Sequence, residues 1–487
     1  MIKTKDNMET TIHNICSIAR VTIEAATPMK VGSGRSCVKT DSLIARDVNG
    51  LPFIPGTTIT GLMRHAMEQE EGGKDQAKRI MGFQDGDKGQ GSWLSVSEAK
   101  LVGGDGRPVD GLKNPETIAA DPFLGRFAQM PIRQHVRIGH RGTTEQAGKF
   151  DEEIIPKGTR FCFELELLSD REHAENDFST LLSFLMGDTF RIGGGSRKGY
   201  GKITIKDIRT RRLDMGNEDE LRAYLDKDSD LSKDWDGFVD TFKGESISKA
   251  ADHYELQLHP VDFIFFSNGL GDPDNGTDKA AIREEYITWS KNAKGIEIPE
   301  WQKSRTSLVV PASSVKGAVA HRTAFYYNQY HGVFADMLDN DEDKIRQATK
   351  RNEAVVALFG SEGDQQGTKG KRRGHVVVSD IVREQKPGTQ PKILNHVKID
   401  RFTGGAIDGA LYDEEPLFAK AEELVLTFTL LPDEETKKEH VGEAFEEALK
   451  DVCRGMLPLG GNVNHGSGCF HGKLMKNGKT IYEYEQD

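Results

Sequence analysis

Three sequence patterns occur twice along this chain, in the same order, and this repetition limits the folds that the chain can adopt. A proline followed by two hydroxyl residues opens the first pattern, a His-Val pair opens the second, and the third is a glycine-rich stretch. The matched residues are Pro55 and Pro311, His135 and His396, and Gly193 and Gly460, which lie 256, 261 and 267 residues apart. Nearly constant offsets over three landmarks indicate a duplicated structural unit.

The duplication divides the 487 residues into two domains and a connection. We predict a first domain over residues 10–207, a charged linker over 208–252 and a second domain over 253–480. In each half, alternating apolar residues predict strands, and apolar residues with helical spacing predict helices. The predicted strands are 15–28, 160–168, 253–266 and 423–431, and the predicted helices are 177–190 and 440–456. Antiparallel strands alternating with helices favour an α+β fold with helices on one face of a sheet.

Net charge and cysteine content limit the functional class and the cellular compartment that we expect for this protein. The net charge of −12 argues against a nucleic-acid-binding protein, because phosphate contacts need Lys and Arg side chains. Much of the acidic charge, however, lies in residues 216–240 and 434–450. The five cysteines are scattered and odd in number, which favours a reducing cytoplasm over a disulfide framework. Because we find neither an apolar run of about 18 residues nor an apolar leader, we expect a cytoplasmic protein without a membrane partner.

The two glycine-rich stretches are candidate contacts for a nucleic-acid backbone. Glycine lets the main chain come close to a phosphate and expose its N–H groups. The candidates are Gly194, Gly195, Arg197 and Lys198 in the first stretch, and Gly460, Gly461 and Asn462 in the second. The first stretch is locally basic and the second is more neutral. Tight structural turns are the alternative interpretation of both.

The hydroxyl pairs mark the beginnings of two helices. We expect these hydroxyl groups to cap the helices, and helix N-termini also bind phosphate. Basic residues on the same helices either reach a nucleic-acid backbone or face solvent. The candidates for phosphate contacts are Thr57, Thr58, Arg64, Ser313, Ser314 and Lys316.

The helix starts and the glycine-rich loops resemble those of the RAMP superfamily (repeat-associated mysterious proteins) of CRISPR systems. The stretch 396–406, HVKIDRFTGGA, followed by Tyr-Asp-Glu-Glu at 412–415, resembles the backbone subunits of type III effector complexes, the Cas-seven family. The resemblance covers nearly the whole chain, twice, and a tandem fusion suggests a type III-D-like branch. It implies a ferredoxin-like (RRM-like) core and a thumb hairpin in each half. The implied partners are CRISPR RNA (crRNA), complementary target RNA, and other backbone and large subunits.

The resemblance also implies a catalytic aspartate in the loop between the first strand and the Pro55 helix. Asp41 matches the family's catalytic position, six residues before Asp47. A carboxylate there would hold Mg²⁺ (or Mn²⁺) or accept the proton of a 2′-hydroxyl group, and no organic cofactor is expected. The alternative is a solvated loop residue. Asp47 lies in Asp-Val-Asn-Gly, a turn sequence, and receives no catalytic role.

The second half departs from this pattern, because its corresponding loop is longer and has no aspartate at the matching distance before Pro311. Asp272 and Asp274 are the favoured substitutes, and Asp278 is a further candidate. The sequence DPDNG in this segment is equally typical of a plain turn, or of an inserted loop that binds a partner.

Basic residues in the expected hairpins complete the candidates for RNA contacts: His135, Arg137, His396, Lys398 and Arg401. Histidine is also a general acid–base group, as in RAMP proteins that process crRNA. A zinc interpretation is disfavoured, because the spacing of Cys453, His465, Cys469 and His471 matches no standard zinc motif. We predict a metal-dependent, crRNA-guided endoribonuclease subunit. The alternatives are a non-catalytic crRNA-binding scaffold and a crRNA-processing endoribonuclease that uses histidine.

Overall fold

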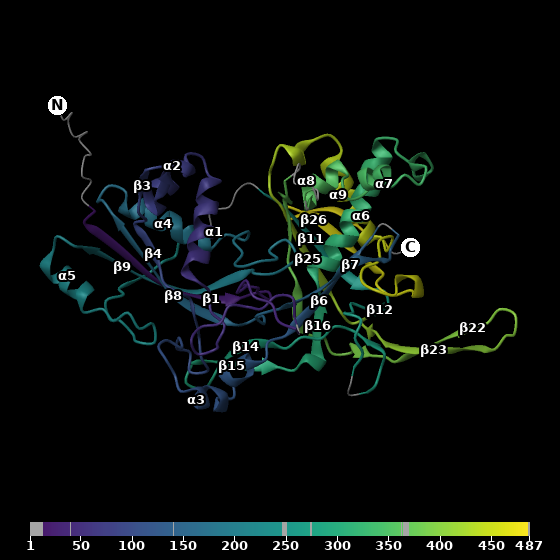
Figure 1. The fold of residues 1–487 in the computed structure, drawn as a ribbon, viewed down its shortest axis with the longest axis horizontal. Helices are drawn as coiled ribbons and strands as arrows, with labels where there is room; N and C mark the ends of the chain where they lie inside the picture. Colours follow the sequence, from purple (N-terminus) through teal and green to yellow (C-terminus); the bar gives the residue numbers. More distant parts are fainter. Residues whose placement is uncertain are drawn as a thin grey trace.

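The computed structural model describes residues 13–38, 40–139, 141–245, 251–272, 275–361, 363 and 370–485. The chain forms a mixed α+β structure with two bodies side by side, the first built mainly from the N-terminal half and the second from the C-terminal half (Figure 1). None of the helices in the described ranges is long and apolar enough to cross a membrane.

The first body is built on an antiparallel sheet with strand order β10-β9-β1-β8-β4, in which β5 also pairs with β8. Its strands are β1 (Ile15–Ala25), β4 (Leu94–Val96), β5 (Lys100–Leu101), β8 (Arg160–Ser169), β9 (Ile203–Asp214) and β10 (Asp240–Thr241). The central strand β1 is almost fully buried, because both faces of the sheet are covered. On one face lie α1 (Gly56–Glu68), α2 (Gly73–Met81) and α4 (Ala174–Leu185).

Residues of the expected linker cover part of the other face of this sheet. Strand β9 extends into this segment, and α5 (Glu218–Leu225) follows it. Cys16, Ile18 and Leu213 form a small core with Tyr224 and Trp235. The described part of the segment is therefore attached to the first body through packed apolar side chains, and the domain boundaries themselves stay a prediction.

The second body repeats the strand order of the first. Its sheet runs β19-β25-β11-β26-β27, so β11 and β25 correspond to the central strands β1 and β8. Its strands are β11 (Asp252–Pro260), β19 (Val376–Val378), β25 (Leu424–Leu430), β26 (Phe470–Lys476) and β27 (Lys479–Glu483). Helices α6 (Ala312–Tyr330), α8 (Glu353–Phe359) and α9 (Val441–Cys453) share a core with this sheet.

Shorter elements connect these parts. The remaining helices are α3 (Pro115–Ala120) and α7 (Glu342–Ala348). Small sheets are formed by β2 (Phe83–Asp85) with β3 (Lys88–Gln90), β12 (Phe263–Ile264) with β24 (Leu417–Phe418) and β21 (Gln390–Pro391), β16 (Ser307–Val310) with β20 (Ile381–Glu384), and β17 (Gly360–Ser361) with β18 (Arg372–Arg373). The strand predicted over 253–266 is broken into β11 and β12, since Pro260 ends β11 and a proline cannot donate to a ladder.

Two hairpins cross between the bodies, and a third leaves them. Strands β6 (Ile132–Ile138) and β7 (Thr144–Glu153) extend from the first body onto the second, whereas β14 (Tyr286–Lys291) and β15 (Glu297–Gln302) extend from the second body beneath the first (Figure 1). Ile287 of β14 joins the core of the first body. The hairpin of β22 (Leu394–Ile399) and β23 (Ala406–Glu415), with β13 (Lys279–Ala280) at its base, projects away from both bodies.

A buried ion-pair cluster fixes the first hairpin on the second body. The guanidinium of Arg133 on β6 bonds both carboxylate oxygens of Glu284 at 2.6 Å and also pairs with Asp380. The side chain of Arg133 is 1 % exposed. The other oxygen of Asp380 accepts a hydrogen bond from the backbone N–H of Ala312 at 2.7 Å, so one cluster joins the hairpin, a loop and the beginning of α6.

Candidate functional site

Asp41 is held against the first hairpin by a reciprocal pair of hydrogen bonds. The backbone N–H of Asp41 donates to Asp151 Oδ1 at 2.8 Å, and the backbone N–H of Asp151 donates to Asp41 Oδ2 at 3.0 Å. The loop is also tied to β7 by a bond from the N–H of Glu153 to the carbonyl of Ser42 at 2.9 Å. Asp41 is exposed and Asp151 is half-buried, so the two carboxylates lie together at the surface.

The second half contains the same arrangement around Asp278. The N–H of Asp278 donates to Asp413 Oδ1 at 2.7 Å, and the N–H of Asp413 donates to Asp278 Oδ2 at 3.0 Å. Asp413 lies on β23, in the position that Asp151 has on β7. Asp278 directly precedes β13, which pairs with β23. The hydrogen bonds therefore place Asp278, rather than a residue chosen by its distance from Pro311, in the position of Asp41.

Asp272 has a different environment from Asp41. It is 7 % exposed, and its Oδ2 accepts a hydrogen bond from Arg283 Nη1 at 2.6 Å. Arg283 also pairs with the buried Glu415. This carboxylate is thus part of the ion pairs that shape the inserted loop. Asp274 lies outside the described residues.

A histidine, an aromatic ring and a buried glutamate accompany the aspartate pair in each half. In the first half, His135 stacks on Phe150 with ring centroids 4.9 Å apart, and its Nε2 lies 2.9 Å from the hydroxyl of Tyr200. Glu152 accepts a bond from Lys30 at 2.5 Å. Burial raises the pKa of Glu152, but the hydrogen bonds from His135 and Lys30 outweigh burial and lower this pKa to about 2.

The corresponding residues of the second half could hold a metal ion. His396 stacks on Tyr412 with centroids 4.9 Å apart, and Glu414 is 1 % exposed. Side-chain ligand atoms of His396, Glu414 and His465 lie within 4.8 Å of one another, the only such group found in the described parts of the chain. Of the residues considered for zinc from the sequence, only His465 belongs to this group; Cys453 is buried in α9.

The glycine-rich stretches form close backbone turns. Gly193 and Gly460 have φ angles of 90° and 100°, and a Cβ atom would lie 2.2 Å from the carbonyl oxygen of Lys30 and 2.7 Å from that of Phe265. The N–H groups of Gly194 and Gly461 already donate to these two carbonyl oxygens, at 2.7 and 2.6 Å. The turns thus have a structural role, and contact of Gly194, Gly195, Gly460 and Gly461 with RNA stays a prediction.

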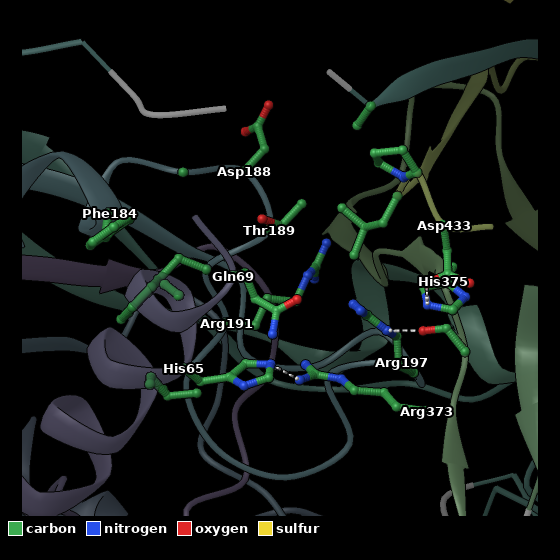
Figure 2. Close-up of a pocket in the computed structure, with 18 of the residues that line it drawn as sticks. His65, Gln69, Phe184, Asp188, Thr189, Arg191, Arg197, Arg373, His375 and Asp433 are labelled. Carbon is green, nitrogen blue, oxygen red and sulfur yellow. Dashed lines mark hydrogen bonds and ion pairs between the residues drawn. The ribbon is translucent and has the colours of Figure 1, made fainter. Parts of the chain in front are cut away.

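The basic side chains of the first glycine-rich stretch lie between the two bodies. Figure 2 shows Arg191, Arg197 and Arg373 gathered in a pocket of about 330 Å³. Arg197 Nε donates to the carbonyl oxygen of Gly374 at 2.8 Å. Burial, together with the charges of Arg373 and Arg191, lowers the pKa of Arg197 to about 9. Lys198 instead lies over the ring of Phe150, with Nζ 4.4 Å from the ring centroid.

The beginnings of helices α1 and α6 differ from the prediction that hydroxyl side chains cap them. Helices α1 and α6 begin after Pro55 and Pro311, and neither has a side-chain cap. The predicted capping by the hydroxyl pairs is wrong, because these residues lie within the first helical turn and the prolines occupy the capping positions. The residues concerned are Thr57, Thr58, Ser313 and Ser314.

The other candidate RNA contacts lie in different settings. Arg64 bonds Glu68 on its own helix at 3.0 Å. Lys316 Nζ donates to the carbonyl oxygen of Phe359 at 3.1 Å, and burial lowers its pKa to about 8. Arg137 lies 4.0 Å from Glu145 on the first hairpin. The exposed Lys398 and Arg401 belong to the projecting hairpin, and Asn462 donates to Glu414.

Comparison with known proteins identifies the family. The model of the RAMP superfamily matches residues 22–204 and 258–471. The chain belongs to the RAMP superfamily. The two matched segments of this RAMP protein lie in the two bodies and confirm the resemblance inferred from the repeated motifs.

Two curated relatives of this RAMP protein have about half its length. The chain is 26 % identical over 247 residues to the "CRISPR system Cms endoribonuclease Csm3" of Methanocaldococcus jannaschii. This alignment covers 44 % of the present chain and 92 % of the relative. It is also 26 % identical over 202 residues to the protein of the same name from Methanothermobacter thermautotrophicus, covering 38 % and 81 %. Nearly a whole relative therefore aligns with less than half of this chain.

Proposed function

We propose that this RAMP protein is a double backbone subunit of a type III CRISPR effector complex, which holds crRNA and cleaves the target RNA paired with it. The observation that carries the proposal is the aspartate pair: Asp41 with Asp151, and Asp278 with Asp413, joined by the same reciprocal hydrogen bonds. The printed names of the relatives, both endoribonucleases of a CRISPR system, agree with it. Each sheet with its helices would be a ferredoxin-like core, and other CRISPR-associated subunits would complete the complex.

Asp41 and Asp278 would be the catalytic residues of the two halves. The backbone bonds to Asp151 and Asp413 hold each carboxylate in one orientation at an exposed surface, beside a second carboxylate. A set of carboxylate oxygens suits Mg²⁺, which would polarise the scissile phosphate when bound. The carboxylate of Asp41 would orient the reacting 2′-hydroxyl group toward the adjacent phosphate. We prefer Asp278 to Asp272, because Asp272 is buried in an ion pair.

The test is cleavage of a labelled complementary RNA by the assembled complex in Mg²⁺, comparing wild type, Asp41→Asn, Asp278→Asn and the double variant. Each single variant should lose a different product band while it still binds target, and the double variant should lose both. Asp47→Asn is the matched control, because Asp47 bonds the backbone of its own turn. Cleavage that is unchanged in the double variant would leave a crRNA-binding scaffold as the function. Cleavage of precursor crRNA without metal would favour the processing alternative.

A further inference from the structure

The two halves differ in the residue that faces the buried glutamate. The glycine-rich turns align so that Lys198 corresponds to His465, five residues after the matched Gly193 and Gly460. In the first half the positive charge of Lys198 helps to lower the pKa of Glu152. In the second half an imidazole stands in place of that ammonium group, and His465 stacks on His396 with centroids 5.3 Å apart.

We propose that His396, Glu414 and His465 bind a Zn²⁺ ion. Imidazole nitrogens and a carboxylate oxygen are zinc ligands, and three protein ligands leave a fourth position open. Nε2 of His396 is buried, lies 3.3 Å from Glu414 Oε2, and makes no hydrogen bond to any described residue. The lone pair of this nitrogen would coordinate a bound cation. The cation would also supply the positive charge that Lys198 supplies beside the glutamate of the first half.

The existing contacts of Glu414 are compatible with this ion. Lys279 Nζ donates to Oε1 of Glu414 at 3.1 Å, so it does not occupy Oε2, the oxygen nearest to His396. Asn462 donates to Oε2, but this oxygen has a second lone pair that can bind a metal. Such contacts from neighbouring side chains are typical of metal-ligating carboxylates.

The position of the site indicates what the ion would stabilise. His396 and Glu414 lie on opposite strands of the projecting hairpin β22–β23, and His465 lies in the glycine-rich turn of the second body. The first hairpin is fixed by Arg133 on the second body, whereas the second hairpin projects away from every other described part of the chain (Figure 1). A zinc ion would join the base of the second hairpin to its own body.

The experiment measures metal binding by the full chain without RNA, after removal of any histidine tag and dialysis against a chelator. Isothermal titration with Zn²⁺ should give one site per chain, and Co²⁺ should give the visible absorption bands of a tetrahedral site. Loss of a residue that only hydrogen-bonds a metal ligand weakens metal binding by about 10–100-fold. His465→Lys, which copies Lys198, and His465→Ala remove a ligand itself and should weaken Zn²⁺ binding by more than this. Zn²⁺ should also slow amide hydrogen exchange in β22 of the wild type only.

His471→Ala is the matched control, because His471 lies in the same C-terminal segment but stacks on Tyr484. It should bind one Zn²⁺ like the wild type. If the wild type binds no Zn²⁺, or if His465→Lys binds it equally well, the proposal is wrong. Because RNA is absent, neither outcome depends on the cleavage activity proposed above.

Discussion

The two halves of the chain place an aspartate pair in the same way but stabilise their hairpins differently. Asp41 and Asp278 lie on loops of different length, yet both bond the backbone of a hairpin strand. The hairpin strand, rather than the length of the loop before the helix, therefore defines the position of the aspartate. The hairpins themselves diverge: β6–β7 rests on a neighbouring body, and β22–β23 projects freely (Figure 1).

Contacts in both directions join the first hairpin to the second body and the second body to the first. Arg133 pairs with two carboxylates of the second half, and β14–β15 contributes Ile287 to the core of the first. Each body thus completes the other.

Removal of Arg133 should have the largest effect, because it leaves Glu284 and Asp380 buried without their partner. We expect Arg133→Leu to lower the free energy of unfolding by about 3–5 kcal/mol. Arg126 is the matched control: it also pairs across the two bodies, with Glu285, but both side chains are partly exposed. Arg126→Leu should cost about 0–1 kcal/mol. Urea unfolding curves of both variants measure the difference, and equal costs would show that burial does not control this interface.

Replacement of Lys316 should stabilise the folded chain, whereas removal of Arg133 should destabilise it. The pKa of Lys316 is about 8, below its ordinary value, so the protonated form is penalised in the folded chain. The penalty is present in full below pH 8 and disappears as the pH rises toward the ordinary value of 10.5. At pH 7, Lys316→Met should therefore raise the free energy of unfolding by about 2 kcal/mol.

Thermal unfolding at pH 7 and pH 10.5 tests this prediction, with the exposed Lys420→Met as control. The stabilisation should be smaller at the higher pH. If Lys316 contacts crRNA, the stabilised variant should also bind crRNA more weakly than Lys420→Met does. A Lys316→Met protein that is less stable than wild type at pH 7 would contradict the expected penalty.

The partners of the catalytic candidates should have intermediate effects on cleavage. Asp151→Asn and Asp413→Asn each replace the carboxylate that accepts the N–H of Asp41 or Asp278, while the backbone donor remains. We expect about 10–100-fold slower cleavage at the matching product site only, as for other residues that orient a ligand. Rates for the separate bands of one labelled target measure this. Equal slowing of both bands by one variant would contradict two independent sites.

Much of the fold could be predicted from the sequence, because local patterns determine it. Apolar alternation identified β1, β8, β11 and β25, and helical spacing identified α4 and α9 within a few residues. The family followed from the repeated motifs. The reciprocal bonds could not be predicted, since they join residues 110 and 135 positions apart. The Asp-Glu-Glu sequence that follows an aromatic residue at 150–153 and 412–415 was the available signal.

The smallest effect concerns the acid stability of the first half. Glu152 has a pKa of about 2, below its ordinary value of 4.5, so its ionised form stabilises the folded chain above pH 4.5. This contribution is lost as the pH falls from 4.5 toward 2. We expect wild type to lose about 1–2 kcal/mol more of its free energy of unfolding than Glu152→Gln over this window, after allowance for solvent screening.

The control is Glu300→Gln on the exposed face of β15, which should follow wild type. Urea unfolding at pH 5.5, 4 and 3 measures the three curves. Parallel curves for wild type and Glu152→Gln would show that Lys30 and His135 do not hold the carboxylate ionised. The Lys198→Gln variant should fall between them, because it removes one cation beside Glu152 and leaves Lys30 in place.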